Sequence, residues 1–421
     1  MKKLLIILIF SSLTISMFSQ EINEPADSLR KDALKVYMDA NDYIKREIPF
    51  INYVRDIKDA QVYIIDTSER TGSGGREYTY FIEGQHEFKG MRDTVSVSTS
   101  PDDTDDQRRL KQVSILKMAL MRYVAKTPLS KHINIIFTKP MREEVTTDKW
   151  NSWVFRSRIS GFLIGQKTYN SSDINSSISA SRVTKDWKLI FDLSYNEGND
   201  KFKIGDETIS SINKSTSVEA LVVKSISDHW SVGGSAEVGS STYRNHKMNI
   251  SFMPGIEFNV FPYSESTRKQ FKFLYSAGYI YHDYEEITIY EKLSESLWAH
   301  SLDATYSVIQ KWGSINMGVE WSNYFHDWNL NNLSLSGNME FRITKGLSFN
   351  VGGGASLIHD QVSLVLSGAT AEEILTRQKE LETSYSYFTH FGLTYTFGSI
   401  FNNVVNPRFR NGGSGGMIII M

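Results

Sequence analysis

The chain of 421 residues has no cysteine, little proline and no large excess of charge of either sign. Without cysteine there is no disulfide, no thiolate metal ligand, no cysteine nucleophile and no lipid-anchored N-terminal cysteine. The formal net charge is -2, so the chain as a whole carries no field that attracts a polyanion. We therefore expect no nucleic-acid partner.

Long apolar runs are absent too, because no segment approaches the roughly 20 residues that a membrane-spanning helix needs. The apolar stretch at the N-terminus covers only residues 4–10; Lys2 and Lys3 precede it, and small residues follow as far as Ser19. This order predicts a secretory signal peptide over residues 1–20.

What the chain has instead is an alternation of apolar and polar residues from about residue 150 to residue 397. Between Asn249 and Val260 the even positions are all apolar, whereas the odd positions include Ser251 and Glu257. Neighbouring side chains on a strand point to opposite faces, so each such segment has one apolar and one polar face. The segments are about 12–20 residues long, whereas soluble strands average roughly 5–6. Length and alternation together predict a transmembrane antiparallel β-barrel.

We predict about twelve strands, an even number as in single-chain outer-membrane barrels. Short connections predict periplasmic turns, and the longer polar connections 197–206, 285–295 and 361–382 predict external loops, the last with a helix over 369–381. All eight tryptophans lie at Trp150 or later, near predicted strand ends, as two aromatic belts require. The predicted strands are 151–166, 171–183, 186–198, 206–225, 229–241, 245–262, 269–286, 294–310, 313–326, 331–344, 346–360 and 383–397; the short connections are 184–185, 227–228, 310–312 and 344–346.

The polar face of these strands carries charges of both signs. We expect the basic residues to pair with the acidic ones and to fill the interior of the barrel, because unpaired charges in a confined space are costly. A narrow solute pathway is the alternative. The predicted inward set is Arg156, Arg158, Lys188, Asp192, Glu219, Glu237, Glu257, Asp303, Glu320, Glu340 and Arg342.

Residues 27–140 precede the barrel and have a different period. Strands are predicted at 34–39, 60–66, 77–88 and 94–98, and a helix over 41–54 that Pro49 divides. A long helix is predicted over 102–126, with an N-cap and an acidic first turn from 103–106 and an apolar stripe of Val113, Leu116, Leu120 and Tyr123. Residues 132–139 are predicted to add a strand. The pattern predicts a compact α+β domain.

The run Asp59-Ala60-Gln61-Val62-Tyr63-Ile64 resembles the start of periplasmic α/β modules of the TolB and CsgG type, over less than a quarter of the chain. The barrel region is similar to bacterial outer-membrane barrels in general, through its periodicity. Together they resemble outer-membrane β-barrel proteins with a small periplasmic N-terminal domain. This resemblance implies a fold and a location, and it transfers no activity.

Three features carry candidate chemistry. The glycine cluster 71–76 lacks the pattern of a phosphate loop and favours a hairpin turn, with ligand binding as the alternative. Asp102, Asp103, Asp105 and Asp106 favour helix capping over calcium binding, because the central glycine and terminal glutamate of a calcium loop are missing. Three His-Asp pairs lie near predicted external strand ends, where a carboxylate can orient an imidazole as a general base; they are His282-Asp283, His326-Asp327 and His359-Asp360.

We therefore interpret the chain as a signal peptide (1–20), a periplasmic α+β domain (27–140), an outer-membrane barrel (147–397) and a periplasmic tail (398–421). The expected function is non-enzymatic: envelope structure, partner docking or passage of a small solute. A barrel-rim hydrolase is the alternative. We assign no catalytic, cofactor-binding or metal-binding residue and expect no cofactor. The expected partners are outer-membrane lipids and a periplasmic protein for residues 27–140. The tail is glycine-rich and ends in the apolar segment 417–421.

Overall fold

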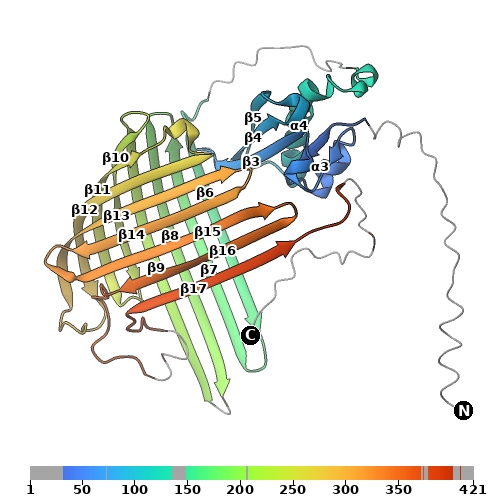
Figure 1. Cartoon of the computed structure of the whole chain (residues 1–421). Helices are drawn as coiled ribbons and strands as arrows, with labels where there is room; N and C mark the ends of the chain where they lie inside the picture. Colours follow the sequence, from blue (N-terminus) through green and yellow to red (C-terminus); the bar gives the residue numbers. More distant parts are fainter. Residues whose placement is uncertain are drawn as a thin grey trace, which may run out of the picture.

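The computed structural model describes residues 32–72, 74–134, 148–204, 207–370, 373, 378–401 and 408. It contains a small sheet with two helices near the N-terminus and a large antiparallel sheet that follows it in the chain (Figure 1). The predicted signal peptide, the predicted strand beyond residue 134, and all but Arg408 of the tail after Phe401 lie outside the described residues.

The small domain has a five-stranded sheet in the order β2-β1-β3-β4-β5. β1 runs parallel to β2 and β3, whereas β3, β4 and β5 form an antiparallel meander. The predicted order of strands and helices is confirmed, but the helix predicted over 41–54 ends at Glu47, and the short strand β2 forms within its predicted range. The bounds are β1 Lys35–Tyr37, α3 Asp42–Glu47, β2 Asn52–Tyr53, η1 Ile57–Asp59, β3 Val62–Arg70, β4 Arg76–Gly84, η2 His86–Phe88, β5 Arg92–Thr99, α4 Asp105–Val124 and η3 Pro128–His132.

Helix α4 covers one face of this sheet and forms the core with it. The predicted stripe is confirmed: Val113, Leu116, Leu120 and Tyr123 are buried in one cluster with residues of β1, β3 and β4. The cap within 103–106 is Thr104, which accepts from the Gln107 backbone N–H, while the Gln107 side chain accepts from the Thr104 backbone N–H. The neighbouring aspartates bind Lys111, Arg108 and Arg109 instead.

The large sheet contains twelve strands, each antiparallel to its neighbours in sequence, as predicted. The loop predicted at 197–206 is wrong, because β8 and β9 continue pairing as a ribbon to Ile204 and Glu207. The bounds are β6 Trp153–Gly165, β7 Tyr169–Val183, β8 Trp187–Ile204, β9 Glu207–Ser225, β10 Trp230–Ser241, β11 His246–Asn259, η4 Tyr263–Glu265, β12 Lys269–Tyr284, β13 Ser294–Gln310, β14 Gly313–Tyr324, β15 Asp327–Thr344, β16 Leu347–Ile358 and β17 Tyr385–Tyr395.

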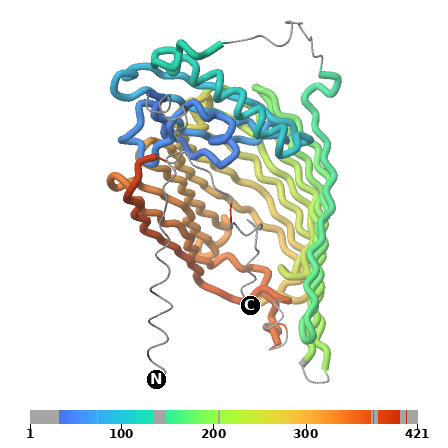
Figure 2. The backbone as a smooth tube through the Cα atoms, turned by 90° about the vertical axis from the view of Figure 1, so that its right-hand side faces the viewer, coloured from blue at the N-terminus to red at the C-terminus, as the bar shows by residue number. Residues whose placement is uncertain are grey.

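The sheet curls strongly but does not close, which corrects the expectation of a closed barrel. β6 and β17 are its two edges, and no pairing joins them (Figures 1 and 2). Every pairing that is present joins strands next to each other in sequence, whereas β6 and β17 are separated by all the other strands. That last pairing has the largest loop-closure entropy to overcome.

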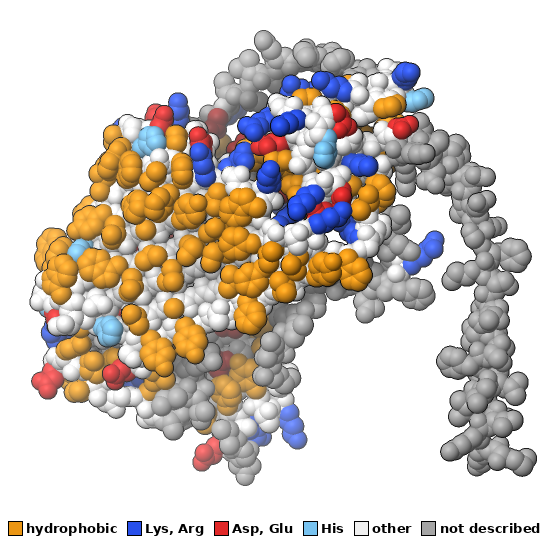
Figure 3. Space-filling view, viewed as in Figure 1, with side chains coloured by type: hydrophobic (Ala, Val, Ile, Leu, Met, Phe, Trp, Pro, Cys, Tyr) orange, Lys and Arg blue, Asp and Glu red, His pale blue; other side chains and the backbone are white. Residues whose placement is uncertain are grey.

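The register assigns each strand an outer and an inner face. Starting from the outward row Phe155, Ile159 and Leu163, the pairings place the predicted inward charges on the opposite face of every strand. Apolar side chains cover the visible outer face of the large sheet, while lysines and arginines gather on the small domain (Figure 3). No described helix is long and apolar enough to cross a membrane.

Candidate functional site

The inner face of the large sheet is the candidate site, and its charges do not pair as predicted. Of the inward set only Glu257 forms an ion pair among the described residues, with Lys272 at 3.3 Å. Like charges instead lie directly opposite each other: Asp192 faces Glu219, and Glu219 faces Glu237. Like charges in such positions repel and are destabilising unless water screens them. The predicted ion-pair plug is therefore wrong, and this wall is suited to contact with water.

The small domain lies across one end of this interior, the end that carries the short turns (Figure 2). The sheet face opposite α4 points toward the barrel strands: Arg342 of β15 stacks 4.4 Å from the Tyr37 ring centroid and donates to its hydroxyl. Tyr63 and Thr67 on the same face are only 6% and 7% exposed. We call this end the covered end.

A second group of contacts fixes the domain at the covered end. Arg268, just before β12, lies 4.8 Å from the Phe81 ring centroid and 3.8 Å from a Glu83 carboxylate oxygen. Lys345, in the turn between β15 and β16, binds Asp59 at 2.7 Å. The next residue, Gly346, donates its backbone N–H to Asp56 at 2.8 Å. Several separate turns of the large sheet thus hold one face of the domain.

A cavity of about 600 Å³ remains between the domain and strands β15 to β17. Its wall includes the inward residues Glu340, Arg342 and Ser348 of the large sheet, together with Asp39, Arg55 and Asp56 of the domain. The described lining therefore carries both acidic and basic groups. A volume of this size is within the ordinary range for small-molecule sites.

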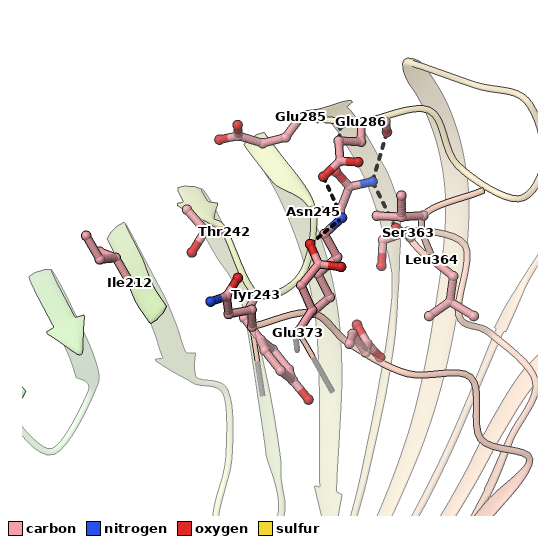
Figure 4. Close-up of a pocket in the computed structure, with 13 residues that line it drawn as sticks. Ile212, Thr242, Tyr243, Asn245, Glu285, Glu286, Ser363, Leu364 and Glu373 are labelled. Carbon is pink, nitrogen blue, oxygen red and sulfur yellow. Dashed lines mark hydrogen bonds and ion pairs between the residues drawn. The ribbon is translucent and has the colours of Figure 1, made fainter. Parts of the chain in front are cut away.

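The opposite end of the interior is bordered by the long loops, and a pocket of about 250 Å³ lies there (Figure 4). Asn245 joins two loops: its amide donates to the carbonyls of Glu286 and Ser363 at 2.9 and 3.0 Å, and it accepts from the Glu286 N–H at 2.8 Å. Lys379 binds Glu286 at 2.9 Å and Glu373 at 3.1 Å. The Thr370 backbone N–H, followed by Lys379, holds the pKa of Glu373 below its usual value. Of the helix predicted over 369–381, residues 371, 372 and 374–377 lie outside the described residues; Glu373 is helical, whereas residues 378–381 are not, so the predicted helix does not extend to 381.

The three His-Asp pairs are not brought together. His282 is buried on the inner face and its ring stacks on His246 at 4.5 Å, whereas Asp283 binds Lys247 at 3.6 Å. His326 packs against Tyr324, and Asp327 accepts from the Asn329 backbone N–H. Asp360 accepts from Asn332 at 3.1 Å. Within the described residues no imidazole bonds to its neighbouring aspartate. His282 and Asp283 are neighbours on β12 and face opposite sides of that strand, which is the physical reason for this pair. His326 lies between β14 and β15, and His359 and Asp360 follow the end of β16.

Gly72 and Gly74 lie in the hairpin between β3 and β4, and the predicted turn there is confirmed. No group of three or more histidine, aspartate or glutamate side chains among the described residues is arranged to hold a metal ion.

Sequence reasoning missed one polar pair on the outer face. His300 is 6% exposed beneath Trp321, Phe325 and Trp328, and its Nε2 lies 3.0 Å from Asn323 Oδ1. The alternation contained the signal, because His300 stands in the outward row between Trp298 and Leu302. His300 Nδ1 also lies 3.4 Å from the Tyr275 hydroxyl, so the pair has a phenol beside it.

Among solved structures, the chain matches one described as the NanC porin in a rhombohedral crystal form. The sequences are 9% identical, the TM-score is 0.28, and the match covers 57% of this chain and 99% of that chain. No protein-family model matches the chain, and no curated protein matches it in sequence. A similarity this low does not establish a common fold, so the fold rests on the strands and register of this chain alone. The resemblance of residues 27–140 to TolB- and CsgG-type modules stays a prediction.

Proposed function

We propose that this protein is an outer-membrane β-barrel protein that allows restricted passage of a small solute, with its N-terminal domain in the periplasm. The observation that carries this proposal is the large sheet itself. Its strands run from 11 to 19 residues, and a tilted membrane strand needs about 9–11. Their outer rows are strongly exposed and apolar: Phe155, Ile159 and Leu163 are 62%, 81% and 77% exposed. A continuous apolar surface on strands of this length is typical of a sheet that faces lipid.

In the membrane the two edges would pair with each other, because an unpaired strand edge in hydrocarbon leaves each backbone group without a partner at a cost of several kcal/mol. The outward rows of both edges occupy odd positions, from Trp153 to Leu163 and from Tyr385 to Tyr395. An antiparallel pairing of odd with odd positions keeps both rows on the lipid side.

The inner wall and the covered end together support restricted passage of a solute. The inner wall carries unpaired acidic groups that favour water, so a plug of ion pairs is not what limits passage. The small domain lies across the covered end, where a cavity beside β15 to β17 remains. The mixed charge of that cavity favours small polar solutes over apolar ones. Docking of a periplasmic protein on the domain, the other predicted role, requires surface away from this face.

We expect the mature protein to fractionate with outer membranes and to be heat-modifiable, because a closed barrel resists unfolding in detergent until it is boiled. The measurement is cell fractionation followed by electrophoresis of boiled and unboiled samples. A cytoplasmic enzyme and a soluble periplasmic protein serve as fraction markers. Recovery of the intact chain in the soluble periplasmic fraction, without detergent, would contradict the proposal.

We also expect the purified protein to give no stable currents of porin size in planar bilayers, because the domain covers one end. Replacing both Arg342 and Lys345 by alanine removes two of its attachments and is expected to make openings more frequent. Lys117→Ala is the matched control, since Lys117 binds Glu47 within the domain at 3.9 Å. Large steady currents from the unaltered protein, or equal currents from all three proteins, would count against a covering role.

A further inference from the structure

The small domain contacts both edges of the large sheet. Covering one end of the interior does not by itself require contacts with both edges. On the first edge, Arg156 of β6 donates to the Gly74 carbonyl at 3.1 Å. Beside it, the Ser181 hydroxyl of β7 donates to the Gly72 carbonyl at 3.4 Å. The hairpin between β3 and β4 is therefore attached to the first two strands of the large sheet.

On the other edge, the chain that leaves β17 pairs with the domain. The Arg55 backbone N–H donates to the Ile400 carbonyl at 3.0 Å, and Val54 forms an antiparallel bridge with Phe401. β2 is the outermost strand of the small sheet on this side, so residues 400–401 extend that sheet. The nearby Lys345–Asp59 and Gly346–Asp56 contacts strengthen the same attachment.

We infer that the N-terminal domain is a closure clamp, which holds β6 and β17 near each other so that the large sheet closes in the membrane. The strands of every other pair follow each other directly in the chain, whereas β6 and β17 are separated by all the other strands of the sheet. Tethering two groups to one rigid body raises their effective concentration and lowers the entropy of bringing them together. The inference rests on the proposed function, because it presumes that the sheet closes into a barrel.

The domain precedes the strands in the chain and has its own buried core, so it can serve as a template for strands that follow it. Its attachment to the β6 side uses the β3–β4 hairpin, and its attachment to the β17 side uses η1 and the edge at β2. Arg268, just before β12, binds the same domain at a point far from either edge in the strand order. Arg268 therefore holds the domain on the large sheet without contacting β6 or β17, so its replacement tests attachment of the domain apart from the effect on the two edges.

The test measures closure directly in the full-length chain, which has no native cysteine to interfere. Phe155→Cys is combined with Phe391→Cys, Leu393→Cys or Tyr395→Cys, all in the outward rows. Urea-unfolded protein is diluted into phosphatidylcholine vesicles under oxidising conditions. The rates of disulfide formation and of appearance of the heat-modifiable form are then followed. When the clamp contacts are unaltered, we expect at least one of the three cysteine pairs to form a disulfide.

Asp59→Lys combined with Arg156→Ala is expected to slow both rates roughly threefold or more, because an ion pair on one edge and a hydrogen bond from a charged group on the other are both lost. Exchanging the partners, as Asp59→Lys with Lys345→Asp, is expected to restore the β17-side contribution, which separates loss of the contact from a folding defect of the domain. Arg268→Ala is expected to change the rates less than the edge variants do.

Equal rates in edge variants, Arg268→Ala and unaltered protein would overturn the clamp while leaving the barrel proposal intact. Failure of the unaltered protein to become heat-modifiable, or of all three cysteine-pair variants with intact clamp contacts to form a disulfide, would instead overturn the barrel itself. A rescue that does not occur in the exchanged variant would show that residue 59 acts through the fold of the domain, and this outcome also counts against the clamp.

Discussion

Replacing Phe252 by arginine is expected to destabilise the membrane-folded protein by about 2–4 kcal/mol, the cost of a basic side chain on the lipid face near the middle of a bilayer. Phe252 is central in β11, stands in the outward row between Ala236 and Tyr279, and is 57% exposed. In hydrocarbon the guanidinium would have no water and no carboxylate partner on that face. The measurement is equilibrium unfolding in urea from phosphatidylcholine vesicles.

The neighbouring residue provides the matched control. Ser251→Arg adds the same side chain one position earlier, on the inner face, where the register places it directly opposite Glu237. We expect this variant to be neutral or slightly stabilising, because it places a counter-charge directly opposite Glu237, whose other cross-strand neighbour is Glu219. If both variants lose the same stability, or if Phe252→Arg has no effect, the assignment of lipid and interior faces is wrong.

The strands could be predicted from sequence because alternation is a local property. Side chains two positions apart lie on one face, so the row from Ile250 to Phe258 defines β11 and its orientation without any knowledge of its partners. The same argument found the stripe of α4, which depends only on helical spacing. Turns with few residues then fix the order of neighbouring strands.

The interior could not be predicted in the same way. Alternation tells which face a charge occupies, but its neighbour depends on the offset that each turn imposes between strands. Glu219 was correctly placed inside, yet its cross-strand neighbours are Asp192 and Glu237 rather than a base. The contacts at the covered end are more remote still: Tyr37 and Arg342 are 305 positions apart. No periodicity connects residues at that separation.

We predict that the fragment 27–140 folds and unfolds cooperatively without the barrel. Within this fragment, Leu120→Ala is expected to cause the largest loss of stability. Leu120 is fully buried between α4 and the sheet, among residues contributed by β1, β3 and β4. Truncating a buried leucine costs about 2–5 kcal/mol through lost transfer free energy and the cavity left behind. For a domain of about 100 residues this corresponds to a fall in Tm of roughly 10–30 °C.

Met118→Ala on the same helix is the control, because Met118 is 63% exposed and its truncation leaves no cavity; we expect a change within about 0.5 kcal/mol. Thermal unfolding followed by circular dichroism distinguishes the two variants. A single sharp transition that Leu120→Ala lowers and Met118→Ala leaves in place means that the domain has an independent core. A fragment with no cooperative transition would mean that the domain depends on the large sheet for its fold, and a domain that folds only after the barrel could not guide its closure.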